Sequence, residues 1–92
     1  MEEKVIHEKE NERFVIYLDG KEVYVEYTLE DKEINLYHTY THPALRGKGL
    51  AAHVVRAAFE FAKENNLKVI PTCSYVQAFV SKKSEYKELI SE

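Results

Sequence analysis

The amino-acid sequence predicts an α+β fold built on a mixed α/β sheet, with strands in the first half and helices mainly in the second. Three observations support this prediction. Apolar residues recur with period two between residues 13 and 41, and with a period of about 3.6 from residue 48 onward. A short apolar stretch then follows the helical pattern, which gives the strand, helix, strand order of a parallel crossover. Three glycines and two prolines punctuate the chain and no linker or repeat divides it, so residues 1–92 are expected to form one domain.

The first half is expected to form an antiparallel meander of three to four strands. Asp19 and Gly20 favour a two-residue type I′ hairpin turn, because both of its central residues need a positive φ. A second polar turn is expected at residues 30–33. The strands are expected at residues 13–18, 23–29 and 34–41, with an optional short strand around 4–7.

A long helix is expected from Lys48, ending at Asn65 and Asn66, since asparagine tolerates the left-handed conformation at helix ends. Its apolar stripe consists of Leu50, Ala51, Val54, Val55, Ala58, Phe61 and Ala62. Residues 67–72 then form a buried strand that should lie parallel to residues 34–41 through a right-handed crossover. Two short helices are expected at 75–82 and 84–90, the second capped by Ser84.

Composition excludes several classes of protein. The net charge is −3, which argues against a general nucleic-acid binder. No uncharged stretch approaches the ~20 residues of a membrane span, and no signal peptide is evident, so we expect a cytoplasmic protein without a membrane partner. One cysteine excludes an internal disulfide and the common zinc sites, so no metal is expected. The charge is uneven: residues 1–35 carry 5 basic and 11 acidic side chains, and residues 36–92 carry 8 and 5.

The segment between the third strand and the long helix has the features of an anion-binding loop. Gly47 and Gly49 allow a tight turn and a close approach of the backbone to a ligand. The helix that follows directs its unpaired N–H groups and the positive end of its dipole at the loop. Arg46 and Lys48 add positive charge. The expected ligand is a phosphate or pyrophosphate.

Two other phosphate-binding motifs do not fit this loop. The Walker pattern GxxxxGK[ST] is absent, and a dinucleotide fingerprint would open a parallel sheet rather than follow a meander. A glycine-rich turn that only starts a helix remains an alternative, as does a binder of nucleotide phosphates.

On these residues the chain resembles the GNAT superfamily of N-acetyltransferases. The pyrophosphate signature of that family, Arg/Gln-x-x-Gly-x-Gly/Ala, is matched by residues 46–51, and Pro43 fits the usual lead-in. The runs HTYTHPALRGKGLA and LKVIPTCSY are similar to a compact single-domain subfamily of about this length. The resemblance implies a GNAT-like fold and acetyl-CoA as the co-substrate, with backbone groups of Thr39, Tyr40 and Thr41 at the pantetheine arm. The pyrophosphate would be held by Arg46, Gly47, Lys48, Gly49, Leu50 and Ala51. The expected partner is an amine acceptor, a small molecule or a protein, and the chain is expected to be a monomer or a weak homodimer.

Two departures from the family pattern bear on catalysis. With Ala78 set on the alanine of the family's N-x-x-A-x-x-x-Y pattern, Ser81 or Lys82 stands where the tyrosine acid is usual. The hairpin that usually walls the acceptor pocket does not fit in the residues after that helix. The alternative function is therefore a non-catalytic acyl-CoA-binding module.

Three residues are candidates for catalysis, each with a structural alternative. Cys73 lies at the carboxyl end of the last strand, where ligands collect and where a following helix lowers a thiol pKa, although a free cysteine often only packs. Pro71 indicates that the two parallel strands separate just before it. Tyr75 is a candidate acid or substrate contact, and His38 a candidate general base, but packing in the helix and in the sheet would explain both.

The remaining histidines are assigned no chemistry. His7 and His53 are expected to lie on the solvated surface.

Overall fold

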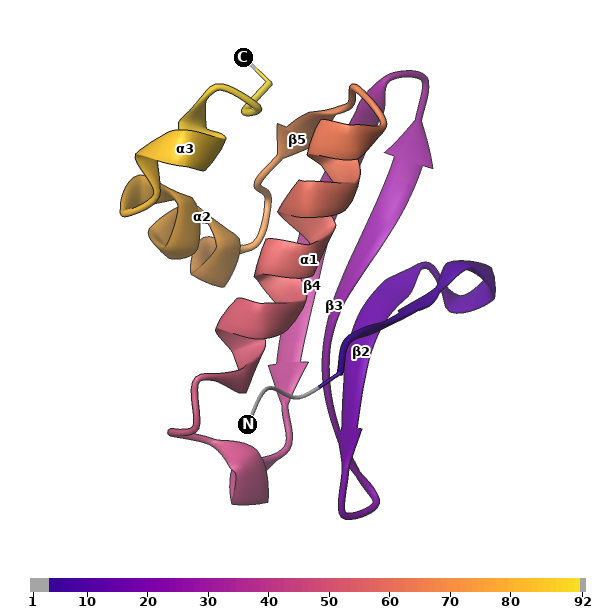
Figure 1. The fold of residues 1–92 in the computed structure, drawn as a ribbon, viewed down its shortest axis with the longest axis vertical. Helices are drawn as coiled ribbons and strands as arrows, with labels where there is room; N and C mark the ends of the chain where they lie inside the picture. Colours follow the sequence, from indigo (N-terminus) through magenta and orange to yellow (C-terminus); the bar gives the residue numbers. More distant parts are fainter. Residues whose placement is uncertain (1–3, 92) are drawn as a thin grey trace.

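The computed structural model describes residues 4–91 as a five-stranded mixed sheet with helices on one side (Figure 1). The strand order is β1-β2-β3-β4-β5, in which β1 to β4 are antiparallel neighbours and β5 is parallel to β4. The predicted α+β fold with a parallel crossover is confirmed. The strands are β1 (Ile6–Glu8), β2 (Arg13–Leu18), β3 (Lys21–Glu30), β4 (Glu33–Thr41) and β5 (Lys68–Ile70).

Local sequence explains the turns of the meander. Asp19 and Gly20 have φ values of 54° and 73°, as the predicted type I′ turn requires. Asp31 in the next turn has a φ of 56°, and asparagine or aspartate tolerates this region better than most residues. The first, optional strand is present and lies slightly later than expected, at residues 6–8.

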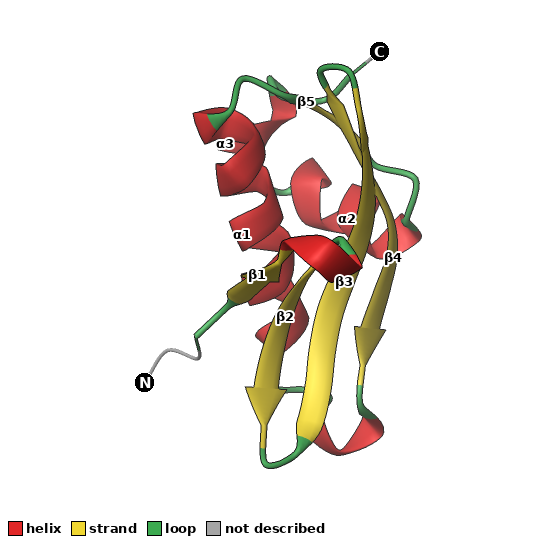
Figure 2. Ribbon diagram, turned by 90° about the vertical axis from the view of Figure 1, so that its right-hand side faces the viewer, coloured by secondary structure: helices red, strands yellow, loops and turns green. Residues whose placement is uncertain are grey.

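Three α-helices and two 3₁₀ turns complete the described chain. The α-helices are α1 (Leu50–Glu64), α2 (Ser74–Ser81) and α3 (Ser84–Lys87), and the 3₁₀ turns are η1 (Lys9–Asn11) and η2 (Pro43–Leu45). Helix α1 runs along one face of β2, β3 and β4 (Figure 2). None of the helices within residues 4–91 has the length and hydropathy that crossing a membrane requires.

A single apolar core lies between the sheet and the helices. From the sheet it receives residues such as Ile16, Val25 and Leu36, each without exposed surface. Phe59 of α1 was missing from the predicted stripe, yet it is fully buried and stacks on Phe79 of α2. This contact is made between two helices. The predicted stripe includes only residues that pack on the sheet, so it does not include Phe59.

The predicted C-terminal helix over residues 84–90 is too long. Helix α3 ends at Lys87, and Ser84 is its first residue rather than its cap. The reason is the edge of β5. The Val69 N–H donates to the carbonyl of Leu89 at 2.7 Å, and the Val69 carbonyl accepts from the Ser91 N–H at 2.8 Å. A buried backbone needs such partners, so the chain extends here to supply them.

His7 was predicted to lie on the solvated surface, and this is wrong. Residue pairing sets His7 opposite Phe14, so both side chains face the helix layer. The imidazole stacks on the Phe14 ring with 4.0 Å between centroids and meets Phe61 of α1 edge-on at 4.8 Å. Its Nε2 lies 2.6 Å from the Tyr27 hydroxyl. Burial, and secondarily the charge of Lys9, lowers the pKa of His7.

This histidine predicts acid sensitivity. Because the folded protein holds the pKa of His7 below its ordinary value of about 6.5, the unfolded chain takes up the proton at a higher pH. The His7 contribution to stability is therefore complete above about pH 6.5 and decreases as the pH falls below it. His7→Phe keeps a stacked ring without a titratable group, so its melting temperature should fall less than that of the wild type between about pH 7.5 and about pH 5.

Thermal melts followed by circular dichroism measure this difference. His53→Gln is the matched control and should keep the full decrease of the wild type. An equal decrease in His7→Phe and the wild type would contradict the assignment.

Candidate active site

Strand β4 has one extra residue within the stretch that pairs with β3. Glu26 of β3 pairs with His38, whereas the next residue, Tyr27, pairs with Leu36, so Tyr37 is an extra residue in the ladder. This irregularity is a β-bulge, a feature that redirects the side chains that follow it. After it, Thr39 and Thr41 lie on the helix side, while His38 and Tyr40 lie on the opposite side against the Tyr24 ring.

The two parallel strands pair only briefly. Their ladder ends at Asn35 and Ile70, immediately before Pro71. The strand predicted over residues 67–72 is therefore too long, whereas the separation predicted at Pro71 is confirmed. One further contact, from the Cys73 N–H to the Leu36 carbonyl at 3.0 Å, holds the two segments together. Beyond Leu36 this edge of β4 forms no backbone–backbone hydrogen bond with another described residue. The strands therefore separate beside Thr39 and leave backbone groups available to a ligand.

The cradle loop, residues 46–51, lies at the start of α1. Gly47 and Gly49 have φ values of 81° and 75°, which glycine adopts without strain. A Cβ at either position would meet no atom within 4 Å, so the backbone here faces open space. Gly49 precedes the helix and no side chain caps it, so the N–H groups of the first turn have no side-chain acceptor at the cap. The helix begins at Leu50, two residues after the predicted start, because of the left-handed Gly49.

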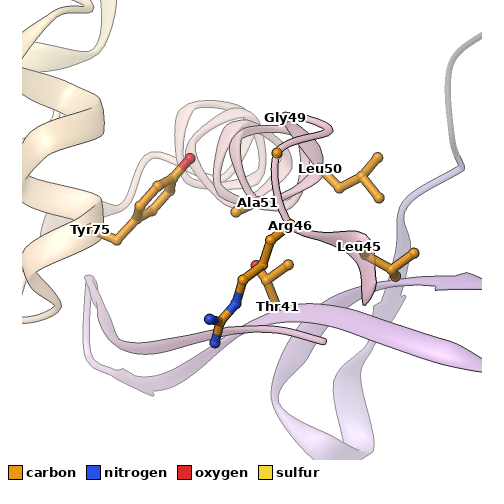
Figure 3. Close-up of a pocket in the computed structure, with 8 residues that line it drawn as sticks. Thr41, Leu45, Arg46, Gly49, Leu50, Ala51 and Tyr75 are labelled. Atoms are coloured by element: carbon orange, nitrogen blue, oxygen red, sulfur yellow. The ribbon is translucent and has the colours of Figure 1, made fainter. Parts of the chain in front are cut away.

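A cavity of about 220 Å³ lies against this loop. In Figure 3, Tyr75 of α2 forms one wall and the loop with Arg46 and Gly49 forms another, with Thr41 and Ala51 between them. The cavity brings together seven predicted residues: Thr41, Arg46, Gly47, Gly49, Leu50, Ala51 and Tyr75.

Leu45 also lines the cavity and was not predicted. It ends the turn η2, which begins with Pro43 and is capped by His42, whose Nδ1 accepts the Ala44 N–H at 3.0 Å. A proline after a capping residue is a helix-start signal that could have been used.

Cys73 lies outside this cavity lining, at the point where the strands separate. Its Sγ lies 3.6 Å from the Thr39 hydroxyl, and the residue directly precedes α2. Burial raises the pKa of the thiol, but hydrogen bonds from the Thr39 hydroxyl and from nearby backbone N–H groups outweigh it. The pKa of Cys73 is therefore lowered overall. The N–H groups belong to Val76, Tyr75 and Thr39.

Tyr75 and His38 occupy different surroundings. Tyr75 retains 37% of its surface, and burial raises the pKa of its hydroxyl. His38 is exposed on the side of β4 away from α1, where its ring meets Tyr24 edge-on at 6.2 Å. The side chains of His38 and Cys73 thus lie on opposite faces of the sheet. Tyr40 shares the side of His38, and Lys48 is exposed without lining the cavity.

The described residues contain no group of three or more side chains suited to a metal ion.

Known proteins resemble this chain in sequence and in fold. Residues 13–89 match the family model of the GCN5-related N-acetyl-transferases. Protein NATD1 of Danio rerio is 38% identical over 80 residues, which cover 84% of this chain and 73% of that protein. Protein NATD1 of Homo sapiens is 32% identical over the same length, covering 84% and 71%.

A solved structure extends the likeness to three dimensions. The solution structure of a GCN5-like protein from Staphylococcus aureus superposes with a TM-score of 0.70 and 26% identity, covering 96% of this chain and 87% of that one. Since the family model covers most of the chain and relatives above 30% identity span it, the expected resemblance is confirmed: the chain belongs to the family of GCN5-related N-acetyltransferases.

Proposed function

We propose that this protein binds acetyl-CoA at the cradle loop and transfers its acetyl group to an amine. The observation that carries the proposal is the position of the loop. An uncapped helix N-terminus with two open glycines lies directly beside the edge of β4 that β5 leaves unpaired. The family contributes the reaction class.

Each part of the cofactor has a suitable group on the protein. The pyrophosphate would accept hydrogen bonds from backbone N–H groups of residues 49–51, while Arg46 and Lys48 supply exposed positive charge. The amide groups of the pantetheine arm would pair with the edge of β4 at residues 39–41, which has no backbone partner among the described residues although the Thr39 N–H contacts the Cys73 sulfur. This arrangement would bring the thioester toward the bulge at Tyr37 and toward Cys73.

The reaction forms one bond and breaks another. The amine nitrogen attacks the acetyl carbonyl carbon, and the carbon–sulfur bond of the thioester then breaks. The amine loses a proton to a base, for which we propose His38, and the departing thiolate takes a proton from an acid. Tyr75 is a candidate donor because a tyrosine hydroxyl is protonated at neutral pH and this residue lines the cavity at the cradle loop. Much of the rate would come from holding the two substrates in line.

Cys73 has a second role open to it. The lowered pKa favours the thiolate, which would attack the acetyl carbonyl carbon and release CoA as its thiolate. The amine would then attack the acetyl-Cys73 thioester, and the carbon–sulfur bond would break to return the Cys73 thiolate. Its position beside Thr39, at the start of α2, supports this role.

One observation favours the alternative of a non-catalytic acyl-CoA-binding module. Ser81, which stands where the family usually has a tyrosine acid, is exposed and donates its hydroxyl to the Ala78 carbonyl at 2.8 Å. Both functions use the cradle loop, and an assay of CoA release in the presence of amines separates them.

Gly49→Val should lower acetyl-CoA affinity by more than about tenfold, because a branched side chain would stand where the backbone meets pyrophosphate. The positive φ also adds strain of about 1–3 kcal/mol to folding. Gly20→Val carries the same strain at a φ of 73° in the β2–β3 turn, outside the cavity, and is the matched control. Calorimetric titration of both variants with acetyl-CoA tests whether the cradle loop binds it. Equal acetyl-CoA affinities of Gly49→Val and Gly20→Val would contradict this binding site.

The double variant Arg46→Ala/Lys48→Ala should weaken acetyl-CoA binding by up to about thirtyfold at low salt, because each exposed ion pair contributes up to about 1 kcal/mol. The effect should shrink at high salt, since exposed charges are screened. Lys63→Ala/Lys87→Ala removes the same charge from exposed positions elsewhere and should leave the affinity unchanged. A loss that does not depend on salt would argue against electrostatic binding.

Cys73→Ser should reduce acetyl transfer by at least about a hundredfold while acetyl-CoA binding persists, if the thiol reacts as proposed. Mass spectrometry of the wild type with acetyl-CoA and no acceptor should then show an acetylated Cys73. Iodoacetamide should alkylate this thiol near neutral pH, and acetyl-CoA should protect it. Unchanged turnover per folded molecule in Cys73→Ser would assign the thiol to packing and leave direct transfer.

A further inference from the structure

The sheet face opposite α1 is rich in tyrosine and glutamate. Side chains of β2, β3 and β4 alternate, so those that do not face the core project to this side. No α-helix of the described residues covers it (Figure 2). We call this surface the open face; the residues that matter here are Arg13, Glu22, Tyr24, Glu26, Glu30 and Tyr40.

The open face is negatively charged, and its carboxylates are distributed along β3. Glu22, Glu26 and Glu30 recur at every fourth position, about 13 Å apart in an extended strand. Arg13 is shared between two carboxylates, with Nε 2.8 Å from Glu8 and Nη2 3.6 Å from Glu22. Within the described chain, Glu26 and Glu30 have no ion-pair partner. The face therefore has more negative charge than its own arginine balances.

Aromatic rings lie beside these carboxylates. The Tyr24 ring of β3 contacts two rings of β4, Tyr40 at 5.3 Å and His38 at 6.2 Å between centroids. The guanidinium of Arg13 already lies 4.8 Å above Tyr24, so this ring accepts a cation in the folded protein. Tyr37, in the bulge, is 44% exposed; burial, and then the charges of Glu26 and Glu12, raises its pKa. Rings flanked by carboxylates suit ammonium and guanidinium groups.

The shape of the open face favours an extended ligand. Small molecules bind mainly in concave sites. Two cavities of the described residues, of about 220 and 230 Å³, lie at the cradle loop and along α2, and neither is lined by residues of the open face. A repeat of about 13 Å along one strand matches an extended polypeptide that carries a cation at every fourth residue.

We propose that the open face docks an extended, lysine- and arginine-rich polypeptide segment, and that a lysine of this segment is the acetyl acceptor. The acceptor role rests on the proposed function, whereas the docking does not. Glu26 lies opposite His38, the residue after the bulge, so a segment along β3 runs beside the strand proposed to hold the pantetheine arm. The proposal narrows the acceptor from any amine to a basic protein segment.

A fluorescent peptide with lysine or arginine at every fourth position tests the docking by anisotropy at low salt. Glu22→Gln/Glu26→Gln should bind it about five- to thirtyfold more weakly, because the charges of two half-buried surface carboxylates are lost. Glu64→Gln/Glu88→Gln makes the same charge change at exposed positions on the helical side and should bind like the wild type. A peptide with glutamate at the charged positions should not bind.

Nuclear magnetic resonance of the protein locates the bound peptide. The largest changes in chemical shift on adding peptide should occur in β3 and β4, at Tyr24, Glu26 and Tyr40. Equal binding by the wild type and Glu22→Gln/Glu26→Gln, or shifts confined to the helices, would overturn the proposal. If a small diamine bound as tightly as the peptide, the proposal that the partner is an extended segment would be overturned. Calorimetry with acetyl-CoA distinguishes the failure of one proposal from the failure of the other. If the protein binds acetyl-CoA but not the peptide, the docking proposal alone is refuted. If it binds the peptide but not acetyl-CoA, the proposed transferase function alone is refuted.

Discussion

The structure depends on how the hydrogen-bonding edges of β4 are satisfied. One edge pairs with β3 over nearly its whole length, whereas the other pairs with β5 for only three residues. Backbone polar groups that are withdrawn from water need partners, so the rest of this second edge stays open, where water or a ligand can satisfy it. Pro71, which has no N–H to donate, stands where the pairing stops. The cradle loop, Cys73 and Tyr75 are all arranged around that opening.

Positive and negative surfaces are separated by the sheet itself. The helix side presents Arg46 and Lys48 at the start of α1, and the open face presents the glutamates of β3. The charge imbalance between the two halves of the sequence thus becomes a difference between two sides of a thin molecule. A polyanion such as a CoA pyrophosphate and a polycation would be attracted to different sides and would meet only at the strand separation.

The sequence was informative wherever the determining interactions are local. The Asp19–Gly20 turn, the cradle loop and the extent of α1 depend on neighbours along the chain, and they were predictable to within about two residues. The bulge at Tyr37 was not, since one extra residue in a ladder appears only when two strands are aligned. The half-buried position of His7 likewise depends on the pairing of a three-residue strand with β2. The prediction of the C-terminal helix was wrong for the same reason, because the carbonyl and N–H of Val69, which is distant in the sequence, determine where α3 ends.

The short β5 strand also bears on how the protein folds. Strands β2, β3 and β4 join through tight turns, so their contacts close small loops at little entropic cost. Pairing Ile34 with Val69 closes a loop of thirty-five residues, and only three residue pairs compensate for it. We therefore expect the meander and its tyrosine-rich surface to form early and β5 to dock late. The opening at which the proposed chemistry takes place would then be the last part of the molecule to acquire its shape and the first to lose it.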